Sequence, residues 1–255
     1  AAVTGGGILR PRFGFAQGFD SFEYGGERNS DGETVWVFDR ARQWIRATRD
    51  RRVFLFVHTY EVHYPHRRRQ PFIDRVAGAE DLTPAAGTVQ MRSHGWKGLR
   101  APGDFFVIRR PGYDDFTNSL TESEIETVGL MYDSAVATVD LQVRHLLDEL
   151  KTLGLKGRTL VIVTSDHGEA LGEDGRAGHA YLDDYNLMVP LIFELPNERC
   201  AGSIIDRQVR LVDLMPTVLD VAGIDLDHPT DGRSLVPLLD EPGAQVPDRA
   251  WAYAA

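Results

Sequence analysis

The chain has 255 residues, of which 42% are hydrophobic and 26% are charged, and this composition is that of a globular domain large enough to bury a core. The formal net charge of −10 excludes an overall basic surface of the kind that binds nucleic acid, so no nucleic-acid partner is expected. The single cysteine, Cys200, excludes an internal disulfide and a cysteine-rich zinc site. No run of 18 apolar residues occurs, so no transmembrane segment is expected in this stretch.

The first fifty or so positions predict an irregular segment followed by a helix. Residues 5–32 are rich in glycine and aromatic side chains and show little periodicity, which indicates a loop with short extended pieces. Residues 33–50 carry apolar side chains at helical spacing and predict an amphipathic helix. The stripe expected to face the core consists of Val35, Phe38, Arg42 and Ile45, with Trp44 beside it.

A strand, a long irregular region and a second helix are expected next. The apolar run VFLFVH at 53–58 follows the first helix and indicates a buried parallel strand. Residues 64–118 carry proline, glycine and charge without a clear period, which is typical of a long functional loop. After Thr121 and Glu124, which form a capping-box pattern, apolar residues recur at helical spacing almost as far as Gly154.

The C-terminal part predicts further strands and one more helix. The expected strands are 159–165, 189–195 and 209–212. Asp213 and Gly223 stand where they would cap a helix at 214–222. The alternation of strand and helix predicts the α/β class, with a mostly parallel sheet sandwiched by helices. No linker is evident, so residues 1–255 are expected to form a single domain.

The most informative motif is TSDHGE at 164–169, directly after the predicted strand TLVIV. Ligands of open α/β sheets bind at the carboxyl ends of strands, and Asp166 and His167 offer a carboxylate oxygen and an imidazole nitrogen there. Gly168 permits a sharp turn, so both side chains can face one metal ion. The same residues also fit a simple turn in which Asp166 caps the backbone and His167 lies at the surface.

Histidines also follow other predicted elements. His179 comes after the Gly-rich segment LGEDGRAG, and His58, His63 and His66 follow the strand VFLFV. Two strand ends would therefore bring histidines to one edge of the sheet. Several histidines next to an aspartate favour a functional site over separate surface residues.

These motifs, with others in the same order along the chain, resemble the sulfatases of the alkaline phosphatase superfamily. The most specific match is TLVIVTSDHGEALGEDGRAGHAYLDDYNLMVPLIF. The strand and loop FLFVHTYEVHYPH also match, with Glu61 and Val62 where Asp and Pro are usual. The other matches are the segment ending in GFD, the helix YDSAVATVDLQVRHLLDEL and the tail RLVDLMPTVLDVAGI with DGRSLVPLL. The resemblance implies an alkaline-phosphatase-like fold and a sulfuric ester hydrolase.

The resemblance also implies the residues of the site. One divalent cation, usually calcium in sulfatases, would be held partly by Asp166 and His167. Imidazole is a softer ligand than carboxylate, so manganese, magnesium and zinc stay open. His63 matches the family histidine that contacts the ester and leaving-group oxygens, and His179 stands where the family has Lys or His near the substrate anion. Both are therefore expected to bind an anionic ester and to act in catalysis.

The sequence departs from the family at the nucleophile. Sulfatases use Cys or Ser in a C/S-x-P-S-R motif, oxidised to formylglycine, and no such motif occurs here, since Cys200 lacks the following Pro-Ser-Arg. The family's first strand ends in two metal-binding aspartates, whereas the pairs 114–115 and 183–184 follow no apolar strand and are interpreted as loop residues. We therefore expect the chain to be the C-terminal two thirds of a catalytic domain, with the formylglycine upstream. The 255 residues alone are then expected to be inactive and poorly stable.

Two other functions fit the same residues. One is phosphoryl chemistry on the same fold, by a phosphonate or phosphodiester hydrolase or a phosphoglycerol transferase, because Asp-His-Gly-Glu and Gly-His occur in those relatives too. The other is a non-catalytic metal-binding protein, since fold alone does not decide chemistry. The run 67–69 of three arginines either steers an anionic substrate or is a solvated loop. The substrate, the oligomeric state and the compartment are not indicated.

Overall fold

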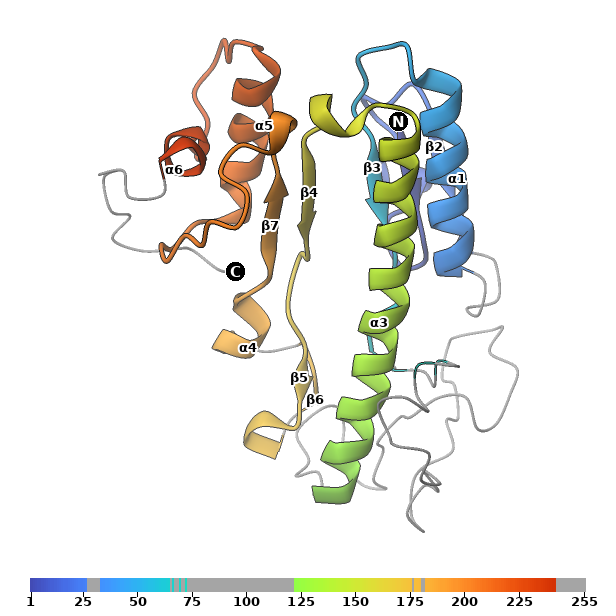
Figure 1. Ribbon diagram of the computed structural model, residues 1–255. Coiled ribbons are helices and arrows are strands. Elements are labelled where there is room, and N and C mark those ends of the chain that lie inside the picture. Colours follow the sequence, from blue (N-terminus) through green and yellow to red (C-terminus); the bar gives the residue numbers. More distant parts are fainter. Residues whose placement is uncertain are drawn as a thin grey trace. The chain divides into compact units, whose positions relative to one another are not determined.

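The computed structural model is shown in Figure 1. The chain divides into two compact units, and we describe each by itself. The first consists of Ala1–Leu153 and Glu169–Ala180, and the second of Gly154–Gly168 and Tyr181–Ala255. The described residues are 1–26, 33–64, 66, 69, 72, 122–175, 177–179 and 182–241.

The first unit is built on a three-stranded parallel sheet in the order β2-β1-β3. The strands are β1 (Ala2–Thr4), β2 (Phe22–Tyr24) and β3 (Phe56–His58). In the centre, Val3 pairs with Glu23 on one side and Val57 on the other. All three residues of β1 are buried. Strand β1 was not predicted, because three residues before a run of glycines are too few to show strand periodicity.

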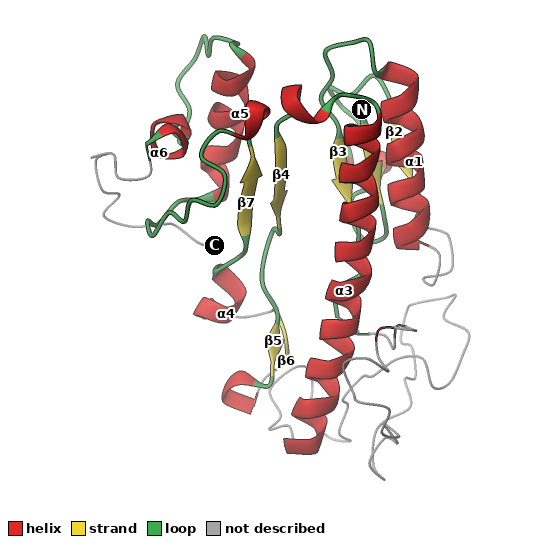
Figure 2. Cartoon of the chain, viewed as in Figure 1, coloured by secondary structure: helices red, strands yellow, loops and turns green. Residues whose placement is uncertain are grey.

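Two helices cover this sheet and form the core of the unit (Figure 2). Helix α1 (Glu33–Thr48) and helix α3 (Glu122–Thr152) confirm the two predicted helices. The core joins Val3 of β1 to Val37 and Phe38 of α1, with Val139 and Val143 of α3 packed against them. The unit is therefore an α/β assembly, as predicted.

The predicted core stripe of α1 was partly wrong. Val35, expected in the core, is 44% exposed. The apolar side chains that α1 buries are Val37, Phe38, Ala41 and Ile45. Two neighbouring stripes of the helix carry apolar residues, and contact with β1 and α3 decides which of them is buried.

Strand β3 is parallel, as predicted for the run at 53–58, but it is shorter and not fully buried. Only residues 56–58 pair with β1. Val53, Phe54 and Phe56 are all more than one third exposed in the described structure. An unbroken apolar run thus identified the strand but not its burial.

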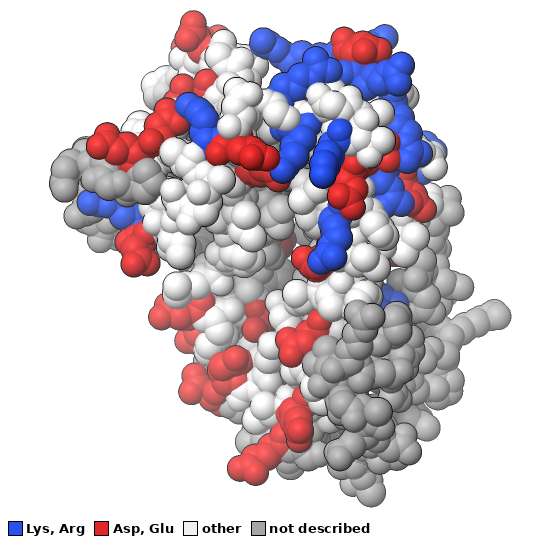
Figure 3. All heavy atoms as spheres, viewed as in Figure 1, with Lys and Arg blue, Asp and Glu red and all other residues white. Residues whose placement is uncertain are grey.

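Helix α3 ends near its predicted end, since Gly154 follows it with a φ of 67°. The predicted capping box lies outside the described residues. Near this end the guanidinium of Arg46 on α1 binds Glu149 on α3 through two bonds of 2.7 and 2.5 Å. Figure 3 shows basic side chains gathered in the region of α1 and the turn after it. Three arginines of α1, at positions 40, 42 and 46, pair with acids.

A short hairpin completes the first unit. Strands β5 (Ala170–Leu171) and β6 (Ala177–Gly178) are antiparallel, with Ala170 opposite Gly178. Leu171 packs against Val128 and Met131 of α3. This contact holds the hairpin on the helix.

The second unit contains an antiparallel pair of strands, β4 (Val161–Thr164) and β7 (Leu191–Glu194). They lie within the predicted strands 159–165 and 189–195, but their pairing differs from the parallel sheet of the first unit. The helices are α4 (Asp184–Leu187), α5 (Leu214–Ala222) and α6 (Val236–Asp240). Leu195, Leu235, Leu238 and Leu239 form the buried cluster of this unit.

The predicted strand at 209–212 was wrong, because residues Leu211–Asp213 form a 3-10 helix that leads into α5. The Asp213 carboxylate explains this. It accepts hydrogen bonds from the backbone N–H groups of Arg210 and Arg233, each at 3.0 Å, and so curls the chain before α5. Asp213 does not cap α5 with its side chain, whereas Gly223 ends α5 with a φ of 65°, as predicted.

None of the described helices is both long and apolar enough to cross a bilayer.

Candidate active site

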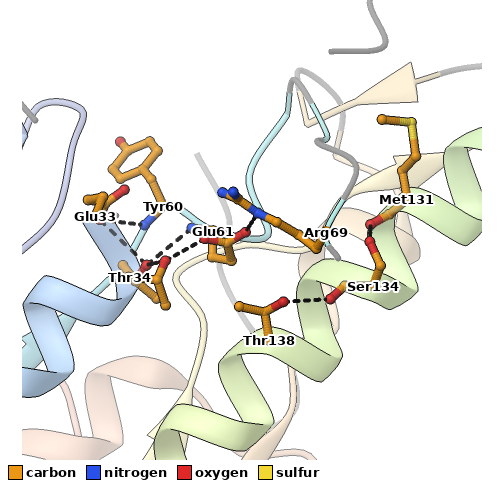
Figure 4. A network of polar contacts seen from close by, with 9 residues as sticks. Glu33, Thr34, Tyr60, Glu61, Arg69, Met131, Ser134 and Thr138 are labelled. Atoms are coloured by element: carbon orange, nitrogen blue, oxygen red, sulfur yellow. Dashed lines mark hydrogen bonds and ion pairs between the residues drawn. The ribbon is translucent and has the colours of Figure 1, made fainter. Parts of the chain in front are cut away.

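The loop after β3 carries His63, and hydrogen bonds join this loop to the start of α1 (Figure 4). Glu61 is the centre of this network and is only 5% exposed. Its Oε2 accepts a hydrogen bond of 2.5 Å from the Thr34 hydroxyl, and its Oε1 pairs with the guanidinium of Arg69. Tyr60 N–H reaches the Glu33 carboxylate at 3.4 Å. A buried, paired carboxylate of this kind holds the loop in one conformation.

Two glycines allow this loop and the one after β1 to approach closely. Gly7 has a φ of 70°, and a Cβ there would lie 2.0 Å from the Tyr60 ring. A Cβ on Gly5 would overlap the Glu33 carboxylate. Gly5 is thus required by a close contact with α1, and Gly7 by one with the loop after β3.

His63 and His179 lie together in the first unit, although they are far apart in the sequence. Their ring centroids are 4.6 Å apart, and the rings are inclined at 60°. His63 follows β3, whereas His179 directly follows β6 of the hairpin. Nδ1 of His63 donates to the carbonyl oxygen of Tyr64, so Nε2 is the His63 atom that would address a substrate.

A third residue of the first unit, Glu169, contacts the segments that carry both histidines, and sequence reasoning missed its role. Its side chain is 4% exposed. Oε1 lies 3.3 Å from Nδ1 of His179, and Oε2 accepts a 3.1 Å hydrogen bond from the Tyr64 N–H. The only signal in the sequence was its place at the end of TSDHGE.

His66 is buried near His63, but its environment differs from that of His63 and His179. It is 1% exposed, and neither ring nitrogen has a hydrogen-bond partner within the described structure. Its ring meets those of Tyr64 and Tyr132 edge to face, with centroids 5.8 and 5.4 Å away. Burial, aided by the nearby His63, lowers the pKa of His66 from 6.5 to about 4. His66 is therefore a neutral core residue.

This pKa predicts a loss of stability in mild acid. Between pH 6.5 and about 4 the unfolded chain binds a proton at His66 and the folded chain does not, so unfolding becomes easier as the pH falls. From pH 7 to pH 5 the loss is about 2 kcal/mol. Replacing His66 by phenylalanine keeps the ring contacts and removes the proton site, so urea unfolding of His66→Phe is expected to lose about 2 kcal/mol less over that range.

The control is His145→Gln, which changes an exposed histidine on α3. Its unfolding free energy is expected to follow the wild-type pH dependence. An unchanged pH dependence in His66→Phe would show that His66 is not buried in its neutral form.

In the second unit, Asp166 and His167 follow β4 directly, as predicted. The Asp166 side chain is 77% exposed, and its Oδ1 lies 3.8 Å from Nε2 of His167. Nδ1 of His167 donates to the carbonyl oxygen of Gly168 at 2.7 Å. This bond fixes the ring and leaves Nε2 as the atom on the side of the Asp166 carboxylate.

Gly168 is needed, but not for the sharp turn that was expected. Its backbone does not have the positive φ that favours glycine. A Cβ there would lie 2.1 Å from the Tyr185 carbonyl oxygen, and the Gly168 N–H donates to the Asn186 carbonyl at 2.7 Å. The glycine therefore allows the segment at the start of α4 to contact the Asp-His-Gly turn.

The donor atoms of this turn fit a divalent cation. A carboxylate oxygen and an imidazole nitrogen are suitable ligands, and a metal-binding histidine ordinarily donates its other ring N–H to a carbonyl or carboxylate. Asp166 and His167 meet both conditions.

The sequence also offered two aspartate pairs and a run of arginines as candidates, and the structure describes only some of these residues. Asp183 accepts a 2.6 Å bond from the Tyr185 hydroxyl beside α4, and Asp184 is exposed. The pair 114–115 and the arginines 67 and 68 lie outside the described residues. Arg69 binds Glu61 and is part of the network that holds the loop.

The sequence and the fold are both similar to those of known proteins. The sulfatase family model matches residues 14–224. The extracellular sulfatase SULF-1 homolog of Drosophila melanogaster is 34% identical over 131 residues, which are 51% of this chain and 11% of that protein. Arylsulfatase K of Bos taurus is 28% identical over 211 residues, which are 80% of this chain and 38% of that protein.

The fold resembles that of the phosphonate monoester hydrolase from Silicibacter pomeroyi, with a TM-score of 0.64 and 23% identity. The match covers 88% of this chain and 44% of that one. The fold is therefore the α/β fold of the sulfatases and phosphonate hydrolases, and the chain spans less than half the length of each of these relatives. Because the family model covers most of the chain, from the loop after β1 to the end of α5, the chain belongs to the sulfatase family.

Proposed function

We propose that this chain takes part in the metal-dependent hydrolysis of sulfate esters, with His63 and His179 acting on the ester and Asp166 and His167 holding the cation. The observation that carries the proposal is the contact between the His63 and His179 rings, whose centroids are 4.6 Å apart. The buried carboxylate of Glu169 lies beside His179. The two imidazoles come from separate segments, and each has Nδ1 against a protein oxygen, which supports a functional pair. Family membership supports the same chemistry.

The two histidines would bind and orient the sulfuryl group. In each ring, Nδ1 contacts a protein oxygen, which is the Tyr64 carbonyl for His63 and the Glu169 carboxylate for His179. In the neutral ring Nε2 is then an acceptor. When the ring binds a second proton, Nε2–H can donate a hydrogen bond to an ester oxygen and can pass that proton to the departing oxygen. Rings fixed in advance stabilise charge without reorganising during the reaction.

The cation would be held by Asp166 Oδ1 and His167 Nε2. When bound, a divalent cation neutralises negative charge that develops on the transferring group. The carboxylate favours calcium, which we propose first, and the imidazole keeps manganese, magnesium and zinc as candidates. The nucleophile of the family, a formylglycine, is proposed by family analogy only.

Hydrolysis of phosphonate or phosphate esters is the second candidate. The observation in its favour is the Asp-His-Gly-Glu turn with the Gly178-His179 pair, which resembles phosphonate and phosphodiester hydrolases as well as sulfatases. The two functions differ in the anion that the histidines accept, so ligand binding can separate them.

Replacing His63 or His179 by alanine is expected to weaken binding of phenyl sulfate about tenfold or more, because each substitution removes a hydrogen bond to a charged group. The affinity for calcium and manganese is expected to stay as in wild type. Isothermal titration with phenyl sulfate, and separately with each cation, measures both quantities. Thr138→Ala on α3 is a matched control outside the pair and is expected to bind phenyl sulfate normally.

The binding of phenylphosphonate, measured in the same way, distinguishes the two candidate functions. If wild-type protein binds phenyl sulfate more tightly, the sulfatase proposal is supported. Tighter binding of phenylphosphonate by tenfold or so would favour the second candidate, and binding of neither anion would contradict both. Loss of cation binding in His63→Ala or His179→Ala would mean that the role of that histidine is misassigned.

A further inference from the structure

We propose that Glu169 is the positioning residue of the histidine pair, selecting the Nδ1–H tautomer of His179 and holding the loop that carries His63. The inference rests on the proposed function, in which His63 and His179 act on an ester. It adds a residue that neither histidine motif identifies.

The hairpin register brings Glu169 to His179. Ala170 pairs with Gly178 and Leu171 with Ala177 in antiparallel β5 and β6. Extending that ladder by one step places Glu169 opposite His179, at the distance where cross-strand side chains interact. The 3.3 Å contact between Oε1 and Nδ1 is the result. The packing of Leu171 on α3 anchors the register.

Burial gives this contact its strength. The Glu169 side chain is 4% exposed, whereas that of His179 is 34% exposed. A hydrogen bond to a carboxylate inside the protein is stronger than one in water, and an ionised carboxylate only accepts. Nδ1 of His179 must therefore carry a proton. Nε2 then accepts a proton in the neutral ring and can deliver it to an ester oxygen.

The second oxygen of Glu169 extends the same control to His63. Oε2 accepts the N–H of Tyr64 at 3.1 Å, and the carbonyl of Tyr64 accepts Nδ1–H of His63. One residue of backbone thus links Glu169 to the His63 ring. The charge of Glu169 also contributes to the raised pKa of Tyr132 on α3, after burial, which agrees with a carboxylate enclosed at this place.

Glutamine at position 169 gives a sharp test. Its single carbonyl oxygen is required by the Tyr64 N–H, so its NH2 group is left facing Nδ1 of His179. Nδ1 can then only accept, and the ring must carry its proton on Nε2. The substitution keeps the size of the side chain and reverses the tautomer.

The measurement is 15N NMR of histidine-labelled protein at pH 8.5, well above the usual histidine pKa of about 6.5. The variant His179→Gln assigns the ring signals by removing one set. We expect the Nδ1–H form of His179 to exceed the Nε2–H form by at least about tenfold in wild type and the ratio to invert in Glu169→Gln. Glu126→Gln, which changes an exposed acid on α3, is the control and leaves the ratio unchanged.

Binding of phenyl sulfate completes the test. Glu169→Gln is expected to weaken it about tenfold, because a sulfate is bound by the doubly protonated His179 ring, whose Nδ1–H the Glu169 carboxylate accepts and the glutamine NH2 group opposes. An unchanged melting temperature separates positioning from loss of fold. An unchanged His179 tautomer in Glu169→Gln overturns the inference. Finding the Nε2–H tautomer of His179 in wild type also overturns the inference, and this result does not depend on whether the variant folds. Failure of wild type to bind phenyl sulfate, with the tautomers as expected, contradicts the proposed function alone.

Discussion

Replacing Asp166 by alanine is expected to lower the affinity of the protein for calcium and manganese by at least about 100-fold. The substitution removes the only carboxylate of the Asp-His-Gly turn and leaves His167 Nε2, whose contact with Oδ1 is 3.8 Å, as a lone imidazole ligand. A single neutral ligand cannot replace the charge that a hard cation requires. Equilibrium dialysis followed by elemental analysis measures the retained metal.

The matched control for this prediction is Asp184→Ala. Asp184 is also an exposed aspartate of the second unit, in the first turn of α4, and its loss is expected to leave metal content unchanged. Full metal occupancy in Asp166→Ala would show that this carboxylate is not a ligand. Equal losses in both variants would indicate a non-specific effect of charge.

Replacing Asp213 by alanine is expected to destabilise the protein by about 3–5 kcal/mol. Asp213 is completely buried. Its carboxylate accepts the N–H groups of Arg210 and Arg233 at 3.0 Å and lies 3.3 Å from the Arg210 guanidinium. Alanine removes the acceptor of both backbone N–H groups and the charge that the Arg210 guanidinium faces, and each lost partner costs free energy. The free energy of urea unfolding measures the loss.

Two further variants make the Asp213 result specific. Asp225→Ala removes an exposed carboxylate just after α5 and is expected to change the unfolding free energy by less than about 0.5 kcal/mol. Asp213→Asn keeps one acceptor oxygen and is expected to fall between the two. A loss below about 1 kcal/mol in Asp213→Ala would contradict the buried role.

The candidate site residues were proposed from the sequence, but their contacts were not. TSDHGE pointed to Asp166 and His167 because the motif is local and follows β4, and their role as metal ligands stays a proposal. His63 and His179 were chosen by resemblance, and their role stays a proposal. Their ring contact depends on two segments that approach only in the folded unit. The roles of Glu61 and Glu169 as buried hydrogen-bond acceptors were not predicted, because the type of a residue does not reveal whether it is buried.

The sequence by itself determined the α/β class, the positions of α1, α3 and α5, and the family, because helical spacing and motif order are local properties of the chain. Tertiary structure alone decided the rest. It made the three residues of β1 the centre of a sheet, chose the buried face of α1 and turned an expected strand into a 3-10 helix around Asp213. It also set Glu169 beside His179. Each of these depends on pairing between distant segments, where buried polar groups must find partners that no local pattern specifies.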